Sequence, residues 1–287
     1  RYFPRLVAYL HEHQNDAGII YCFSQKATEE LAEKLQKEGF SALPYHAGLP
    51  DDVRAEHQEA FIRGDVMIIC ATVAFGMGIN KPDVRFVIHT DLPRDLESYY
   101  QETGRAGRDG EAADCILFYS RGDYGTIRYL IEKEYNDPAQ KDIAYRKAGM
   151  MLDYCETTGC RRKFLLTYFG EAYPEERCGG CDRCETPVKV FDGTEVATTI
   201  ITCIRGIGER FGASYVVDVL TGSKSARIRE NGHDTLPVYN SGRGYTRDQW
   251  LRFVQEMVQK GFITSTGGRY PVLVLNDRSR AVLKGEL

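Results

Sequence analysis

The 287-residue sequence contains no apolar run of about 18 residues, the minimum that a membrane-spanning helix needs. It has no secretory signal at its start, and Arg1 in place of an initiator Met leads us to expect a piece of a longer protein. With 43% hydrophobic and 27% charged residues, it has neither a disordered nor a collagen-like composition. These absences exclude a membrane partner and predict a soluble globular protein of two or three domains.

Two motifs of a self-contained ATPase site are also missing. No Gly-x-x-x-x-Gly-Lys-Ser/Thr sequence occurs, and the nearest resemblance, Gly222-Ser-Lys-Ser225, lacks the preceding glycine. The sequence also has no Asp-Glu pair, the usual form of a magnesium-binding motif. We therefore expect this chain alone to be inactive as an ATPase.

Basic residues are slightly outnumbered by acidic ones, 37 Lys and Arg against 41 Asp and Glu, and they are unevenly placed along the chain. The net charge of the whole chain is −4. Residues 193–287 hold 13 Lys and Arg against 9 Asp and Glu, a net of +4, which leaves −8 for the first 192 residues. A mildly basic C-terminal module therefore follows an acidic N-terminal part, and such a basic module is compatible with binding nucleic acid.

Four of the nine cysteines, Cys160, Cys178, Cys181 and Cys184, form the pattern C-x17-C-x2-C-x2-C. Four thiolates can close a tetrahedral Zn²⁺ site, and the segment around the last three is too rich in Gly, Cys and charge to pack without a metal or another staple. An iron–sulfur cluster and free thiols are the alternatives. The other five cysteines lie in or beside apolar segments and are expected to be buried thiols: Cys22, Cys70, Cys115, Cys155 and Cys203.

Four short apolar runs between residues 18 and 119 alternate with amphipathic stretches, which predicts a parallel α/β sheet. The runs are 19–23, 66–70, 85–89 and 115–119. A helix is expected to start after Ser24, its N-cap, and to end near Gly39.

The remaining sequence predicts helices and one hairpin. A helical segment covers 142–169, and further helices are expected over 193–207, 215–220 and 223–230 and from Trp250 to Gly261. Apolar stretches around Gly267 and Gly268 predict a hairpin. Helices closed by a hairpin indicate a winged helix.

The segment Gln101-Glu-Thr-Gly-Arg105-Ala-Gly-Arg108-Asp-Gly110 places two arginines three residues apart. Planar guanidinium groups can bind phosphate oxygens bidentately, and a γ-phosphoryl transition state needs such charge. A solvated Gly/Arg turn is the alternative.

A second segment, residues 71–82, follows an expected strand and contains Thr72, Gly76 and Gly78. The glycines permit close backbone approach, and ligands of open α/β sheets bind at the carboxyl ends of strands, so these residues are candidates for phosphate binding. A tight strand-to-helix connection is the alternative.

Together with Tyr45-His46-Ala-Gly-Leu49, these segments resemble the second-lobe motifs of superfamily 2 helicases, and their wording resembles the RecQ family over nearly the whole chain. The resemblance implies a RecA-like α/β lobe over residues 1–120, a helical zinc-binding module over 121–190 and a winged helix over 191–287.

The resemblance also implies roles for single residues. Arg108 would be the arginine finger that reaches the γ-phosphate, with Arg105 and Gln101 supporting the nucleotide. Ser24, His46 and Thr72 would lie near single-stranded DNA, although a helix cap or structural hydrogen bond is the alternative for Ser24 and His46.

In the winged helix, duplex phosphates would be bound by four basic residues: Lys224, Arg227, Arg229 and Arg269. Charge on an exposed helix face is the alternative for each of them.

The function implied is that of an ATP-dependent 3′–5′ DNA helicase of recombination and repair, located in the cytoplasm at the bacterial nucleoid. ATP and Mg²⁺ would be bound jointly with the missing N-terminal lobe, and Zn²⁺ by the cysteines. Partners would be single-stranded and duplex DNA and a single-strand-binding protein. The alternatives are a non-catalytic junction-recognition module with a degenerate lobe and, less favoured, an RNA helicase.

Overall fold

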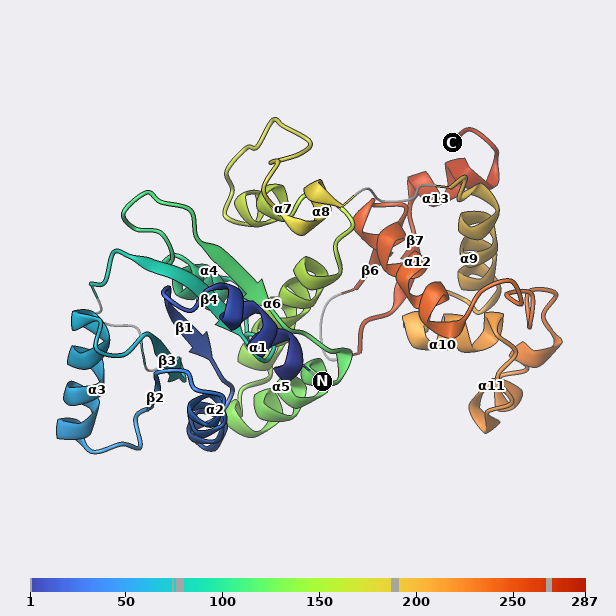
Figure 1. Cartoon of the computed structure of the whole chain (residues 1–287). Helices are drawn as coiled ribbons and strands as arrows, with labels where there is room; N and C mark the ends of the chain where they lie inside the picture. The colour runs from blue at the N-terminus through green and yellow to red at the C-terminus, as the bar shows by residue number, and fades with distance from the viewer. Residues whose placement is uncertain (1, 74, 76–79, 187–190, 267–269) are drawn as a thin grey trace. The chain divides into compact units, whose positions relative to one another are not determined.

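The computed structural model describes residues 2–73, 75, 80–186, 191–266 and 270–287. The chain divides into two compact units, Arg1–Leu130 and Ile131–Leu287 (Figure 1). Within the described residues, every helix is too short or too polar to cross a membrane. The expected domain boundaries at residues 120 and 190 stay a prediction.

The first unit is built on a parallel sheet of five strands in the order β2-β3-β1-β4-β5. Its elements, in chain order, are α1 (Phe3–Glu12), β1 (Ala17–Tyr21), α2 (Gln25–Lys37), β2 (Ala42–Tyr45), α3 (Asp51–Arg63), β3 (Ile68–Ala71), β4 (Val84–His89), α4 (Leu96–Thr103) and β5 (Asp114–Leu117). Helix α5 (Arg121–Glu134) runs across the division between the two units. The predicted parallel α/β sheet is confirmed.

The register of the sheet aligns the last residues of all five strands. Tyr21 pairs with Ala71 on one side and His89 on the other. Tyr45 pairs with Ala71, and His89 pairs with Leu117. The segments that follow the strands therefore all leave the sheet at one edge, which we call the carboxyl edge.

Side chains alternate between the two faces of the sheet, and each face has its own core. On one face, Ile20 and Ile88 pack with Leu31 of α2 and Leu6 of α1. On the opposite face, residues such as Ile19 and Val87 pack with Phe61 of α3 and Phe75, and Ala106 of the arginine segment packs against them. The arginine segment therefore packs against this face of the sheet.

The apolar runs alone predicted four strands, and β2 is the fifth. Pro44 interrupts its apolar pattern. Proline lacks the N–H that a central strand needs, but β2 is an edge strand, where the missing donor is tolerated. Helix α2 confirms its expected caps: the Ser24 hydroxyl accepts a hydrogen bond from the Ala27 N–H, and Gly39 adopts a φ of 91°.

The second unit is mostly helical and contains one short antiparallel hairpin. Its remaining elements are α6 (Pro138–Glu156), α7 (Arg161–Tyr168), α8 (Asp182–Glu185), α9 (Thr194–Gly206), α10 (Ala213–Leu220), α11 (Ala226–Glu230), the 3₁₀ helix η1 (His233–Thr235), α12 (Arg247–Gln259), β6 (Ile263–Ser265), β7 (Leu273–Leu275) and α13 (Asp277–Leu283). Helix α13 was not predicted.

The C-terminal helices and the hairpin share one hydrophobic core, as expected for a winged helix. Ile200, Val217, Ile228 and Val254 are fully buried in it. The Trp250 indole N–H, also buried, donates a 2.8 Å hydrogen bond to the Gly242 carbonyl. The tip of the hairpin, with Gly267, Gly268 and Arg269, lies outside the described residues.

Two expectations need correction. Helix α11 was expected to include Lys224, but it begins only at Ala226, after its N-cap Ser225, so Lys224 lies ahead of the helix. Cys115 was expected to be buried, but it is exposed because β5 is the edge strand of the sheet.

Gly18 in β1 provides a test of the packing between β1 and β4. A Cβ atom added there would lie 1.9 Å from Phe86 Cε2, so Gly18→Ala should destabilise the first unit by about 1–3 kcal/mol or more. Gly125→Ala in α5 is the matched control, because an added Cβ meets nothing within 4 Å and should stabilise by up to about 1 kcal/mol. Urea unfolding followed by far-UV circular dichroism measures both. The single tryptophan, Trp250, reports separately on the second unit, and equal midpoints for the two variants would contradict the prediction.

Candidate functional site

The arginine segment is held against the amino-terminal part of β4. The Gly107 N–H donates a 2.9 Å hydrogen bond to the Val84 carbonyl, and Gly107 has a φ of 62°. A Cβ at Gly107 would lie 2.6 Å from the Glu111 carbonyl oxygen, so the turn needs glycine on both counts. An ion pair between Arg85 and Asp109 fastens the same turn from β4.

A buried polar cluster lies beneath the arginines. His89 Nε2 lies 2.7 Å from Glu102 Oε2, and the two side chains are only 4% and 10% exposed. The imidazole ring of His89 stacks on the ring of Tyr21, with centroids 5.1 Å apart. The Tyr21 hydroxyl donates to the Phe75 carbonyl at 2.9 Å. Strands β1 and β4 thus supply one side of the cluster and helix α4 the other.

Arg105 and Arg108 bring positive charge to this cluster. Burial raises the pKa of Tyr21, and the charges of Arg105 and, more weakly, Arg108 act against that rise. Arg105 Nε is buried and has no hydrogen-bond partner among the described residues. The Arg108 side chain is exposed, with its Nε donating to the Gly104 carbonyl at 3.2 Å. Both arginines thus lie near enough to Tyr21 for their charges to act on it, and Gln101 is exposed on α4.

The residues expected near single-stranded DNA lie at the carboxyl edge, and two of them make structural hydrogen bonds. Ser24 caps α2. His46 is buried, with Nε2 3.1 Å from Glu29 Oε1 and Nδ1 3.2 Å from the Gly48 amide. Thr72 is partly exposed, and its N–H donates to the Tyr45 carbonyl at 3.1 Å. The DNA contacts of all three stay a prediction.

Gly76 and Gly78 lie outside the described residues. Two apolar residues that no sequence motif indicated lie exposed at the carboxyl edge: Phe23 after β1, 41% exposed, and Val73 after β3, 75% exposed. The Phe23 amide is fixed by Asp91 Oδ2 at 3.2 Å. Their exposure could have been predicted from their positions. Each residue comes just after a buried strand, where a large apolar side chain is already beyond the hydrophobic core.

The four predicted cysteines come together in the second unit. Their sulfur atoms all lie within 4.8 Å of one another, and those of Cys178 and Cys184 are 3.9 Å apart. Zn–S bonds of about 2.3 Å in tetrahedral geometry would separate the sulfurs by about 3.8 Å, so the cluster fits a zinc ion. Cys160 caps α7 through its side chain, and Cys181 stands at the N-cap position of the short helix α8 without a side-chain capping bond.

Backbone amides support two of these thiols as anions. The Lys163 N–H points to Cys160 Sγ at 3.5 Å, and the Cys178 N–H points to Cys184 Sγ at 3.3 Å. Burial opposes ionisation of Cys160 and Cys184, but these N–H groups and neighbouring thiols hold the pKa of both below its usual range. Burial and the same neighbouring thiols raise the pKa of Cys178 to about 11, so that thiol holds its proton in the metal-free cluster. Thiolate is the form that binds a metal.

Arg161 joins the helices around the cluster. Its guanidinium forms an ion pair with Asp182 of α8, including a 2.8 Å Nη2–Oδ2 contact, and donates to the Tyr154 carbonyl of α6 at 2.7 Å. These contacts give Arg161 a structural role beside the cluster. Arg162, the next residue, is exposed.

The basic residues of the winged helix lie at its surface. Lys224, Arg227 and Arg229 are all exposed. The Arg227 guanidinium lies over an aromatic ring, with its carbon 5.1 Å from the Tyr215 centroid.

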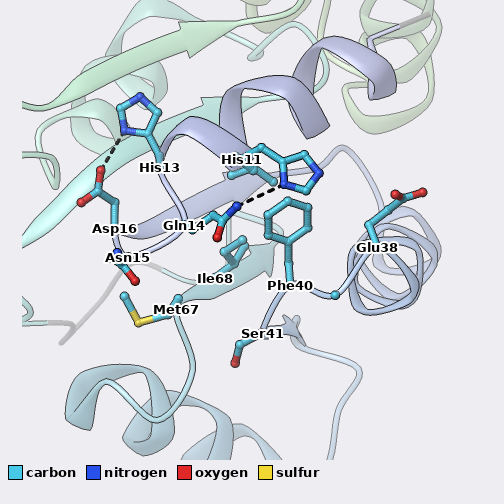
Figure 2. A pocket seen from close by; sticks show the side chains of 12 residues that line it. His11, His13, Gln14, Asn15, Asp16, Glu38, Phe40, Ser41, Met67 and Ile68 are labelled. Atoms are coloured by element: carbon cyan, nitrogen blue, oxygen red, sulfur yellow. Dashed lines mark hydrogen bonds and ion pairs between the residues drawn. The ribbon is translucent and has the colours of Figure 1, made fainter.

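A separate hollow of about 370 Å³ lies at the amino ends of β1, β2 and β3, away from the carboxyl edge. Figure 2 shows that its polar side chains pair with one another: His13 Nδ1 lies 2.7 Å from Asp16 Oδ2, and Gln14 Nε2 lies 3.4 Å from His11 Nδ1. Phe40 contributes an apolar wall. We assign no ligand to this hollow.

Three known protein domains match the chain in succession. The helicase conserved C-terminal domain matches residues 2–110, the RecQ zinc-binding domain residues 121–185, and the RQC domain residues 187–287. The described part of the first region contains strands β1 to β4 of the parallel sheet, and that of the second contains the four-cysteine cluster.

Curated relatives match over nearly all of this chain. The ATP-dependent DNA helicase RecQ of Bacillus subtilis (strain 168) is 40% identical over 279 residues, which cover 97% of this chain and 47% of the relative. The ATP-dependent helicase SGS1 of Saccharomyces cerevisiae is 41% identical over 253 residues, 85% of this chain and 18% of that protein. The chain thus spans about half the length, or less, of these relatives.

Among solved structures, a DEAD box protein from the hyperthermophile Methanococcus jannaschii aligns with 46% of this chain and 36% of its own. It is 30% identical, with a TM-score of 0.40.

The buried His89–Glu102 pair should stabilise the first unit. Glu102→Ala leaves His89 Nε2 without its partner in a site closed to water, which should cost about 1–3 kcal/mol. Hydrogen-exchange mass spectrometry of peptides from β1 and β4 measures the loss. Glu111→Ala, at an exposed position on the same lobe, is the control and should leave exchange unchanged. Equal protection in the two variants would show that the pair contributes nothing.

Proposed function

Because the chain belongs to the RecQ family, with its helicase C-terminal, zinc-binding and RQC domains in that order, we propose that it forms part of an ATP-dependent DNA helicase. In this proposal it supplies an arginine finger, a zinc module and a winged helix. The observation that carries the proposal is the arginine pair, Arg105 and Arg108, set over the buried Tyr21–His89–Glu102 cluster on the RecA-like lobe.

ATP and Mg²⁺ would be bound jointly with a second lobe, because this sequence has neither a phosphate-binding loop nor an Asp-Glu pair. Arg108, the more exposed arginine, would act as the finger on the charge of the γ-phosphoryl transition state. Arg105, with one buried N–H still unsatisfied, would bind the same nucleotide from closer to the cluster. Gln101, Gly76 and Gly78 would complete this side of the site.

The DNA partners would be a single strand at the carboxyl edge and a duplex at the winged helix. Ser24, His46 and Thr72 would act at the edge through the backbone around them, since the side chains of the first two are already engaged. Movement from 3′ to 5′, a role in recombination and repair, a nucleoid location and a single-strand-binding protein as partner belong to the same proposal.

The arginine finger can be tested in a protein that joins this chain to a lobe with a phosphate-binding loop. There, Arg108→Ala should lower DNA-stimulated ATP turnover by about 10³-fold or more while duplex affinity stays nearly intact, because the finger acts on transition-state charge. Arg63→Ala, an exposed arginine of α3 in the same lobe, is the control. Turnover that survives Arg108→Ala would show that Arg108 is not the finger, whereas an unaltered joined protein without DNA-stimulated turnover would favour the non-catalytic DNA-binding module.

Zinc is the metal that we propose for Cys160, Cys178, Cys181 and Cys184. Elemental analysis should find one zinc ion per chain, and its removal by a chelator should unfold the segment around the cluster, because metal binding there is coupled to folding. Cys181→Ser should lose the ion and leave the first unit folded. Cys155→Ser, outside the cluster, should keep it. Iron in place of zinc, or a folded segment without metal, would contradict the proposal.

A further inference from the structure

Arg227 of α11 rests on a stack of aromatic rings that no sequence motif indicated. The rings of Phe211 and Tyr215 are nearly parallel, at 14°, with centroids 4.0 Å apart. The Arg227 guanidinium carbon lies 5.1 Å from the Tyr215 centroid and 5.5 Å from the Phe211 centroid. One cation therefore lies over two ring faces, an attractive arrangement.

The rings themselves are held in place. Tyr215 is buried in the winged-helix core, and its hydroxyl lies 2.8 Å from His233 Nδ1. The ring of His233 in turn meets Phe211 edge-on, with centroids 5.3 Å apart and planes at 86°. The Phe211 carbonyl accepts a 3.0 Å hydrogen bond from the N–H of Leu273 in β7. The stack is thus anchored to η1, α10 and the hairpin.

Helix α11 has few other attachments to the core. It contains five residues, and Ile228 is its one buried side chain. The Tyr215 hydroxyl also lies 3.5 Å from the Arg227 carbonyl. The aromatic stack therefore fixes both the side chain and the backbone of Arg227.

The charge of Arg227 is available to a ligand. Its side chain is exposed, and within the described part of the chain its guanidinium has no ion-pair or hydrogen-bond partner. Partial burial and the charge of Arg210 lower the pKa of His233, so the imidazole is neutral at pH 7. Positive charge at this surface comes from the arginines and not from the histidine.

We propose that Phe211 and Tyr215 are positioning residues that hold the Arg227 guanidinium ready to bind one phosphate of duplex DNA. The proposal rests on the DNA-binding function proposed above and adds how one contact is made. A free arginine side chain loses rotamer freedom when it binds, and a side chain held by stacking has already lost much of it. The guanidinium edge, away from the rings, can then donate two parallel hydrogen bonds to phosphate.

The test is a double-mutant cycle in the 287-residue chain, with affinity for a fluorescein-labelled blunt duplex measured by anisotropy between 50 and 200 mM NaCl. Arg227→Ala should make the slope of log affinity against log salt shallower by about 0.9, the loss of one phosphate contact. Phe211→Leu, which keeps every charge, should lower affinity about two- to fivefold, the range of an exposed cation–π contact. In the Arg227→Ala background, Phe211→Leu should have no further effect.

Phe262→Leu is the matched control, because Phe262 also carries an arginine over its ring, with the Arg278 guanidinium carbon 4.2 Å from the centroid. It removes the same atoms from the same domain and should leave duplex affinity unchanged. Phe211→Met, which also removes the ring, should reproduce the effect of Phe211→Leu if the leucine variant folds poorly.

The outcomes separate this inference from the proposed function. If the unaltered chain has no salt-dependent affinity for duplex, both are wrong. If it binds but Phe211→Leu and Phe211→Met lower affinity equally with and without Arg227, or match Phe262→Leu, the rings act only in folding and the inference is overturned. An unchanged salt slope in Arg227→Ala would overturn it as well.

Discussion

The parallel hydrogen-bonded register of the first unit is the constraint on which its other features depend. It sets Tyr45, Ala71, Tyr21, His89 and Leu117 in one row across five strands. Strand direction then makes every following segment leave at the same edge. A slip of one residue in β4 would turn His89 to the opposite face and separate it from Tyr21 and Glu102.

The polar cluster of Tyr21, His89 and Glu102 explains how residues 101–110, a segment rich in glycine and arginine, can be held in one place. Burying the carboxylate of Glu102 is costly unless a partner meets it, and His89 is that partner. Arg85 and Gly107 secure the far side of the same segment. Both ends of the arginine segment are thus attached to β4: one through the His89–Glu102 pair and the other through Arg85 and the Gly107 amide. The same strand leads to Asp91 at the carboxyl edge.

Local patterns predicted much of this arrangement. Alternating apolar runs indicated the sheet, and Ser24 and Gly39 marked the ends of α2. The spacing of the cysteines predicted that four sulfur atoms lie together, as they do in the structure. The sheet and the helix caps depend on residues that are close in sequence. The cysteine cluster is predictable because few arrangements of four thiolates can bind a metal ion.

Contacts between distant residues with ordinary side chains were not predictable in the same way. His89 and Glu102 belong to different elements, and neither residue type indicates by itself that the two side chains pair. The stack of Phe211, Tyr215 and Arg227 needs α10 and α11 to be in place first. Strand β2 was obscured by Pro44, whose tolerance depends on its position at the sheet edge.

The strand order also governs how the first unit can be synthesised. Strand β1 lies at the centre, yet it leaves the ribosome before both of its neighbours, β3 and β4. At about 5–20 residues per second, the roughly 70 residues between β1 and the end of β4 take several seconds to appear. During that interval the apolar residues Ile19 and Ile20 belong to a strand with two open edges, the kind of segment that aggregates or is bound by chaperones. Translation speed between β1 and β4 should therefore influence the yield of folded protein.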